Sequence, residues 1–166
     1  MVNICLSDDL RSALEVNKIN PESEYLPAYG GESAGLDLYN CGPTIDIRSS
    51  RDIQSGSLAP QKVLIPTGIR IDVPRGYVAL VQERGSVTKT PLKVRAGVID
   101  SGYTGEIFVN CVNVGPDVYT IYARQKLPFQ VVVVKCDNQF KVVSEQEYLD
   151  LTSTAQRKDG QVGSSD

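Results

Sequence analysis

Apolar residues occur in short runs along most of this chain, and proline or glycine ends nearly every run. The runs are rich in β-branched and aromatic residues, and turn sequences such as "PTG", "VPRG", "DSGYTG" and "NVGPD" separate them. Short runs of this composition between turn signals are typical of antiparallel strands. In "GIRIDV", residues 68–73, apolar and charged residues alternate, which predicts a strand with one face in water. The pattern therefore predicts an all-β fold.

Six stretches carry the strand pattern, namely 62–65, 69–73, 77–82, 106–114, 118–123 and 129–136. The last of them contains Val131 to Val134, which is apolar at every position. A strand without a polar face is expected to be covered on both sides. We expect this cover in the core of a β-sandwich or at a contact between subunits.

Two short segments carry helical signals instead. "SDDLRSALEV" starts with the capping residue Ser7 and spaces Leu10 and Leu14 by four. "SEQEYLDLTS" repeats this arrangement with Ser144 and Glu147. The residues that follow it are polar and have no apolar period, which is typical of a flexible tail.

The length and composition favour one domain. A chain of 166 residues with 41% apolar residues can bury one core. We therefore expect a single β domain over residues 1–150, in which residues 1–30 form a partly helical N-terminal extension. We expect residues 151–166 to form a flexible C-terminal arm.

The charge is weakly acidic, with a formal net charge of -3. Such a chain has no overall positive field that would hold nucleic acid. No apolar run approaches the ~20 residues of a membrane span, and the N-terminus lacks the basic start and apolar centre of a secretory signal. These features predict a cytoplasmic protein that binds neither nucleic acid nor membrane.

The chain contains four cysteines and no histidine. The cysteines are widely scattered, without the close spacing of zinc or redox sites, so we expect reduced, buried thiols. The absence of histidine excludes Ser-His-Asp and Cys-His catalysis. Acid-base chemistry must then fall to Asp, Glu, Tyr or Lys.

Two stretches carry candidate chemistry. In "ERGSVTKT", residues 83–90, Gly85 would allow a sharp turn, and the amides at the start of a short helical turn would bind phosphate oxygens beside Arg84. An ordinary surface turn explains the same residues. In "VRAGVIDSGYTGEIFVN", residues 94–110, Asp100 follows an apolar arm and Tyr103 lies at the tip of a predicted hairpin. An acid there would orient a water, but a turn-forming Asp and a packed tip aromatic are the alternatives.

Five motifs, in order and in approximate spacing, resemble those of the trimeric dUTP diphosphatase (dUTPase) family. They are "AGLDLYN" from Ala34, "QERGSV" from Gln82, "AGVIDSGYTGEI" from Ala96, "KLPFQVVVV" from Lys126 and "RKDGQVGSSD" from Arg157. The third motif is the most specific. The resemblance implies a distorted jelly-roll or β-barrel of antiparallel strands, assembled as a homotrimer with its sites at the subunit boundaries.

The resemblance also implies the reaction, which is hydrolysis of dUTP to dUMP and pyrophosphate. Asp100 would activate the water that attacks the α-phosphorus, Tyr103 would exclude a ribose 2′-hydroxyl, and Arg84 would act on the phosphates. The implied substrate contacts are Arg84, Gly85, Ser86 and Gln130 at the phosphates, Val94, Gly97, Val98, Ile99, Asp100 and Phe108 at uracil, and Arg157, Val162, Gly163 and Ser164 in an arm from a neighbouring subunit. The implied cofactor is Mg²⁺, held mainly by the triphosphate, and Asp37 would be either structural or linked to the metal through water.

The sequence departs from the family pattern in the second, fourth and fifth motifs. Gly85 precedes Ser86 in the second motif, and Val162 replaces the usual stacking aromatic of the fifth. Two alternatives therefore remain. A related dCTP deaminase would need a glutamate where this chain has Asn110, and a dUTPase-like trimer without catalysis would serve binding or regulation.

Overall fold

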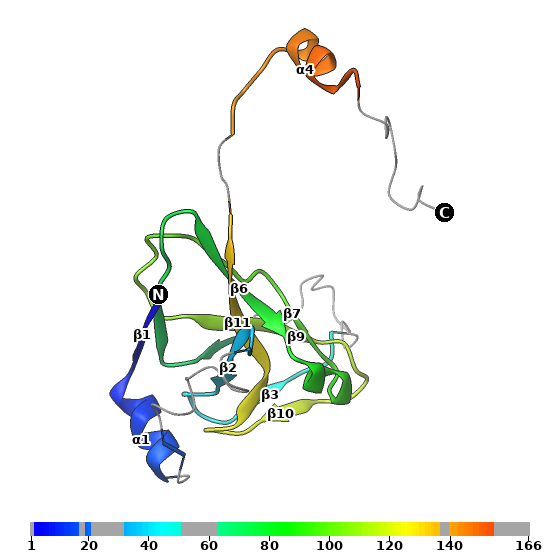
Figure 1. Ribbon diagram of the computed structural model, residues 1–166. Coiled ribbons are helices and arrows are strands. Elements are labelled where there is room, and N and C mark those ends of the chain that lie inside the picture. Colours follow the sequence, from blue (N-terminus) through cyan, green and yellow to red (C-terminus); the bar gives the residue numbers. More distant parts are fainter. Residues whose placement is uncertain (1, 17–18, 21–31, 51–62, 137–139, 155–166) are drawn as a thin grey trace.

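The computed structural model describes residues 2–16, 19–20, 32–50, 63–136 and 140–154. Most of the ordered elements among them are short strands, so the predicted all-β fold is confirmed (Figure 1). The elements are β1 (Asn3–Leu6), α1 (Asp8–Val16), β2 (Gly35–Tyr39), β3 (Ile45–Ile47), β4 (Val63–Pro66), β5 (Ile69–Asp72), β6 (Tyr77–Glu83), the 3-10 helix η1 (Gly85–Lys89), β7 (Leu92–Val94), β8 (Val98–Ile99), β9 (Phe108–Asn113), β10 (Tyr119–Ile121), β11 (Lys126–Lys135) and α4 (Glu145–Thr152).

The strands form two larger sheets and two ribbons, and every pair of named strands is antiparallel. One sheet has the order β2-β11-β6-β8 and the other the order β4-β9-β7. The ribbons are β1-β5 and β10-β3. The long strand β11 lies between β2 and β6 and buries Leu127, Phe129 and Val131 in the core.

All six predicted strands are present, as β4, β5, β6, β9, β10 and β11. In β5 the burial alternates as expected, because Ile69 and Ile71 are buried while Arg70 and Asp72 are exposed. Four strands lie outside the predicted stretches: β1, β2, β3 and β7 have three to five residues each. The two-residue strand β8 lies in the apolar arm of the predicted hairpin.

The expected cover of residues 131–134 is incomplete in the single chain. Val131 is buried, but Val134 is 37% exposed. The prediction of a sandwich core therefore holds only for the first part of the run. Cover of the second part by another subunit remains a prediction.

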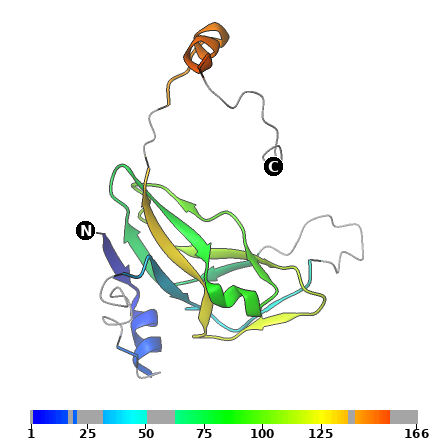
Figure 2. The ribbon, with the colours of Figure 1, turned by 45° about the vertical axis from the view of Figure 1, so that its right-hand side comes forward.

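The N-terminal segment packs into the domain. β1 pairs with β5, and Ser7 caps α1 by accepting a hydrogen bond from the amide of Leu10 at 3.2 Å. Leu10 and Leu14 are each only 1% exposed. The predicted helix is confirmed, and its apolar pair belongs to the core. Figures 1 and 2 show β1 and α1 along one edge of the strands.

The second predicted helix, α4, is also confirmed. Ser144 caps it by accepting a hydrogen bond from the amide of Glu147 at 3.2 Å. None of its residues is buried, and it lies apart from the strands in both views (Figures 1 and 2). The expected boundary after residue 150 falls inside α4, and the division into domain and arm remains a prediction. No helix in the described part of the chain is long and apolar enough to cross a membrane.

None of the four cysteines forms a disulfide, but their burial differs from the prediction. Cys111 is buried, and this burial raises the pKa of its thiol to about 12. Burial also raises the pKa of Cys41, which is partly covered. Cys5 is exposed, so the expectation of buried thiols is wrong for this residue.

Candidate active site

The predicted hairpin is paired only at its base. β7 pairs with β9 up to Val94, and the amide of Arg95 donates to the carbonyl of Asn110 at 2.7 Å. Beyond this point the rising strand β8 pairs with β6, with Ile99 opposite Ala79. A strand has two hydrogen-bonding edges. One edge of β8 is therefore used by β6, and the other faces the falling arm of the hairpin across a gap.

Ala96 and Gly97 turn the rising arm away from β9. Both have a left-handed φ, of 57° and 105° respectively. The carbonyl of Gly97 accepts a hydrogen bond from the amide of Val81 at 2.8 Å. A Cβ at Gly97 would lie 3.0 Å from the carbonyl oxygen of Val81, so both conformation and space require glycine. The dipeptide "AG" thus opens the hairpin.

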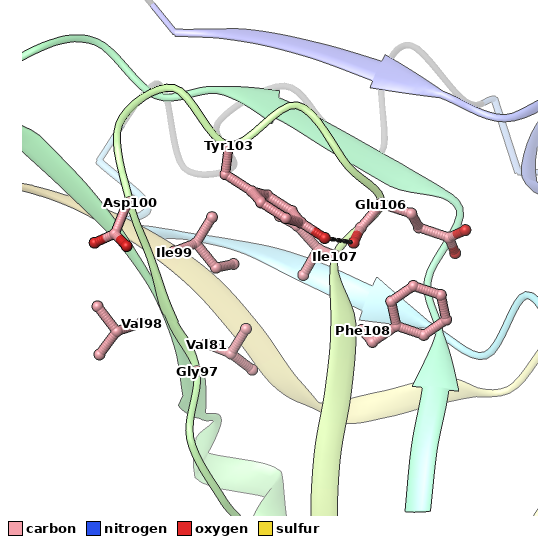
Figure 3. Close-up of a pocket in the computed structure, with 9 residues that line it drawn as sticks. All are labelled: Val81, Gly97, Val98, Ile99, Asp100, Tyr103, Glu106, Ile107 and Phe108. Atoms are coloured by element: carbon pink, nitrogen blue, oxygen red, sulfur yellow. Dashed lines mark hydrogen bonds between the residues drawn. The ribbon is translucent and has the colours of Figure 1, made fainter.

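A cavity of about 250 Å³ lies between the separated arms (Figure 3). Its lining residues are Val81, Gly97, Val98, Ile99, Asp100, Tyr103, Glu106, Ile107 and Phe108. Apolar side chains form most of the wall, while the open main-chain edge of β8 supplies amides and carbonyls. This combination suits a flat ring with a polar edge.

Asp100 lies at the rim of this cavity and is exposed. Its carboxylate and the side chain of Val98 project to one side of the rising arm, and Ile99 projects to the other (Figure 3). Asp100 has no ion-pair partner among the residues that the structure describes. Although the rising arm is apolar in sequence, Val98 is 68% exposed.

Tyr103 folds back over the tip of the hairpin. Its hydroxyl donates to the carbonyl oxygen of Glu106 at 2.9 Å (Figure 3). A Cβ at Gly105 would lie 2.5 Å from this hydroxyl, so glycine is needed beneath the ring. Tyr103 is 46% exposed and lines the cavity. It is therefore both packed on its own hairpin and available to a ligand.

A second group of polar side chains surrounds Asp37 on β2. Arg84 Nε lies 2.6 Å from Asp37 Oδ1, and Lys126 Nζ lies 2.9 Å from Asp37 Oδ2. Arg84 also donates through Nη1 to the carbonyl of Leu127 at 3.3 Å. One acid thus holds two cations, and the cluster keeps a net positive charge. Such a cluster can receive a phosphate.

Gln130 lies beside this cluster. It pairs with Asp37 across β11 and β2, and its Nε2 donates to the carbonyl of Glu83 at 3.2 Å. A Cβ at Gly35 would overlap with the side-chain amide of Gln130, so the glycine makes room for this side chain.

The predicted short helical turn after Arg84 is η1, and the amide of Val87 donates to the carbonyl of Arg84 at 2.9 Å. Gly85 and Ser86 are exposed at its start. The turn at Gly85 does not require glycine, because its φ is not left-handed and a Cβ there would meet open space. Its lack of a side chain leaves the main chain accessible to a ligand.

The structure therefore collects the predicted residues into two groups on one chain. Gly97, Val98, Ile99, Asp100, Tyr103 and Phe108 share the cavity, whereas Asp37, Arg84, Gly85, Ser86 and Gln130 belong to the region around η1 and are not among its lining residues. Val94, at the end of β7, does not line the cavity, and its amide donates to Glu83 Oε1 on β6 at 3.3 Å. Arg157, Val162, Gly163 and Ser164 lie outside the described residues.

Sequence reasoning missed Lys126 and Glu106. Lys126 is the first residue of the quoted fourth motif, but its partner Asp37 is far away in the sequence. Glu106 lines the cavity and follows the tip of the hairpin directly. Its position after "YTG" was the available signal.

The described residues contain no group of three or more His, Cys, Asp or Glu side chains that could hold a metal ion. Both carboxylate oxygens of Asp37 are engaged by cations, which favours its structural role. A magnesium ion here would take its oxygen ligands mainly from bound phosphates and water.

Comparisons with known proteins agree with this arrangement. A family model described as dUTPase matches residues 23–166. The deoxyuridine 5′-triphosphate nucleotidohydrolase of Escherichia phage T5 is 36% identical over 131 residues, which are 74% of this chain and 82% of the phage protein.

Two solved structures have the same fold. The dUTPase of Staphylococcus bacteriophage 80alpha with dUPNHPP matches with a TM-score of 0.70 and 21% identity, over 100% of this chain and 98% of that chain. A mutant dUTPase from phage phi11 of S. aureus, studied for its coordination of a structural Mg(II) ion, matches with a TM-score of 0.64 and 20% identity, over 87% and 97% of the two chains. These likenesses confirm the expected all-β fold of the jelly-roll type.

Proposed function

The chain belongs to the dUTPase family, and on this premise we propose that it hydrolyses dUTP to dUMP and pyrophosphate. The observation that carries the proposal is the cavity of about 250 Å³ in the split hairpin, with Asp100 and Tyr103 at its rim. These residues lie within the part of the chain that the family model matches.

Uracil would occupy the cavity between the two arms. Its polar edge would pair with the open main-chain edge of residues 97–100 and with Phe108, while Val81 and Ile107 would cover the ring. Main-chain groups in a fixed ladder are rigid donors and acceptors, so they discriminate between bases through geometry. The narrow gap between the two arms would also leave little room for a 5-methyl group.

The deoxyribose would then lie against Tyr103, and the α-phosphorus would come next to Asp100. The Asp100 carboxylate would orient and deprotonate the attacking water. Its exposure and its lack of an ion-pair partner among the described residues support this role, since a carboxylate without a cation remains available for a proton.

The phosphates would be held by Arg84, the main chain at Gly85 and Ser86, and Gln130. Asp37 would orient Arg84 while Lys126 keeps the cluster positive. Magnesium, which the dUTPase family uses, would be bound mainly by the triphosphate. When bound, it would offset the negative charge of the phosphates.

A complete site would require more than one copy of the chain. The cavity and the Asp37 cluster have no lining residue in common, so the cluster of a neighbouring subunit would complete each cavity. We therefore propose a homotrimer with sites at the subunit boundaries. Two exposed apolar residues, Val98 and Val134, support an assembly that covers them. Residues 151–166 would form an arm that carries Arg157 and the segment from Val162 to Ser164 over a neighbouring nucleotide.

The test is pyrophosphate release from dUTP, dCTP, dTTP and UTP in parallel, with magnesium present and ammonia measured on dCTP. Rapid release from dUTP alone is expected. Ammonia from dCTP would identify a deaminase, although Asn110 lacks the carboxylate which that reaction needs. Binding of dUTP without turnover would identify a non-catalytic trimer and contradict the proposal.

A further inference from the structure

We infer that Glu106 is a positioning residue for sugar selection, because its side chain fixes the main-chain carbonyl that holds Tyr103. The inference rests on the proposed function, in which Tyr103 contacts the deoxyribose. Glu106 itself does not need to touch the substrate. Figure 3 shows its carboxylate directed away from the ring of Tyr103, while its carbonyl accepts the tyrosine hydroxyl.

The position of Tyr103 depends on Glu106. The hydroxyl donates to the Glu106 carbonyl at 2.9 Å, and the ring passes over Gly105. Packing covers only part of Tyr103, which is 46% exposed. Its orientation over the cavity is therefore set by where the Glu106 carbonyl lies.

Glu106 is anchored through its side chain to the amide of Gly68. Its Oε1 accepts a hydrogen bond from the amide of Gly68 at 2.8 Å. Gly68 follows β4 with a φ of 68°, and a Cβ there would lie 2.6 Å from Ser7 Oγ and 2.8 Å from the Cβ of Leu10. The carbonyl of Gly68 in turn accepts from the amide of Ser7 at 2.7 Å. The anchor is thus held tightly against the start of α1.

The next residue, Ile107, is attached by main-chain and side-chain hydrogen bonds. The amide of Ile107 donates to the carbonyl of Ile69 at 2.8 Å, and Thr67 Oγ1 donates to the carbonyl of Ile107 at 2.6 Å. These bonds hold the falling arm at Ile107, one residue beyond Glu106. The bond from Glu106 to Gly68 is the side-chain contact that extends the attachment toward Tyr103.

These contacts form a continuous connection from the N-terminal segment to the rim of the cavity, through Ser7, Gly68, Glu106 and Tyr103. The N-terminal extension therefore supports the part of the hairpin that would select the sugar. A purely structural role for Glu106 would change stability without changing the preference for dUTP over UTP. The two roles can thus be separated by experiment.

The experiment compares Glu106→Ala, Glu106→Gln and the control Glu15→Ala, which removes an exposed carboxylate from α1. For each protein, kcat and KM are measured with dUTP and UTP, and hydrogen exchange of the Gly68 amide is measured without nucleotide. We expect Glu106→Ala to reduce the ratio of kcat/KM for dUTP to that for UTP about tenfold, the effect of one lost charge-assisted bond. Glu106→Gln, whose amide oxygen can still accept from Gly68, should recover most of the ratio.

Faster exchange at Gly68 in Glu106→Ala, together with the lost preference and its recovery in Glu106→Gln, supports the inference. An unchanged preference despite faster exchange overturns it, and so does an equal loss in both variants. Unchanged exchange at Gly68 in Glu106→Ala overturns it regardless of activity. Failure of the unaltered protein to hydrolyse dUTP would instead contradict the proposed function, and the exchange result would still report on the anchor.

Discussion

Arg84 Nε lies 2.6 Å from Asp37 Oδ1, and the same carboxylate holds Lys126 through its other oxygen. The planar guanidinium of Arg84 is thus oriented before any ligand arrives, with further N–H groups left for a phosphate. Preorganised donors need little rearrangement on binding, which makes them more effective than mobile ones.

Replacement of Asp37 by Asn should therefore weaken phosphate binding more than folding. Without the carboxylate, Arg84 loses its orientation and repels Lys126. We expect kcat/KM for dUTP to fall about tenfold, while the free energy of unfolding changes by only about 1 kcal/mol because the ion pairs are partly exposed. Steady-state kinetics and urea denaturation measure both effects. Asp72→Asn, at an exposed acid on β5, is the matched control.

Replacement of Asp100 by Asn should leave dUTP binding nearly intact and lower kcat by about 10²-fold or more, the effect of a lost general base. Asparagine keeps the size of the side chain but cannot accept a proton from water. Single-turnover kinetics and binding of a non-hydrolysable dUTP analogue check the two parts. Asp117→Asn, at an exposed acid after β9, should retain activity. Normal turnover in the Asp100 variant would show that another group activates the water.

Replacement of Tyr103 by Ala should raise activity on UTP relative to dUTP. The smaller side chain leaves space beside the 2′ position that the ring would otherwise fill. The measurement is the ratio of the two kcat/KM values, with Tyr122→Ala as a control at another exposed tyrosine. A ratio that does not move would exclude Tyr103 from sugar selection.

Two neighbouring substitutions should have opposite effects on stability. Gly97→Ala places a Cβ 3.0 Å from the carbonyl oxygen of Val81 at a φ of 105°, so we expect a loss of about 1–3 kcal/mol in the free energy of unfolding. Ala96→Gly relieves a left-handed alanine with a φ of 57° and should be neutral or stabilising by up to about 1 kcal/mol. Urea denaturation of both variants tests this prediction. Equal destabilisation by both would mean that Ala96 is not strained.

Cys111 should make the protein less stable at alkaline pH. Burial raises its pKa from 9.0 to about 12, so the folded chain keeps the thiol proton while the unfolded chain releases it above about pH 9. The stabilisation is complete below pH 9 and is lost as pH rises toward 12, with a slope approaching about 1.4 kcal/mol per pH unit. The difference in unfolding free energy between the unaltered protein and Cys111→Ala, followed from pH 8 to 11, isolates this effect. A difference that is constant with pH would contradict it.

The sequence was sufficient for the elements whose pattern is local. The alternation in residues 68–73 predicted β5 and its exposed face, and Ser7 with its apolar pair predicted α1. The residues around the hairpin tip were also identified, because Asp100, Tyr103 and their glycines lie within one short motif.

Pairing between residues far apart in the sequence could not be predicted from local patterns. β8 has only two residues, and nothing in "VI" indicates that it pairs with β6 and not with β9. The contact between Glu106 and Gly68 joins residues 38 positions apart in the sequence. Local sequence also does not show whether a turn glycine is required, and at Gly85 the backbone would accept a side chain.

The split between β8 and β9 has a consequence for how this family can evolve. If the base completes a β-ladder in place of a missing strand neighbour, it is recognised by main-chain groups, which all residues except proline share. Point mutations in the cavity wall can then change affinity or the size of the base that fits, but they leave the hydrogen-bonding pattern of the main chain unchanged. A change of that pattern would instead require an insertion or deletion in the rising arm.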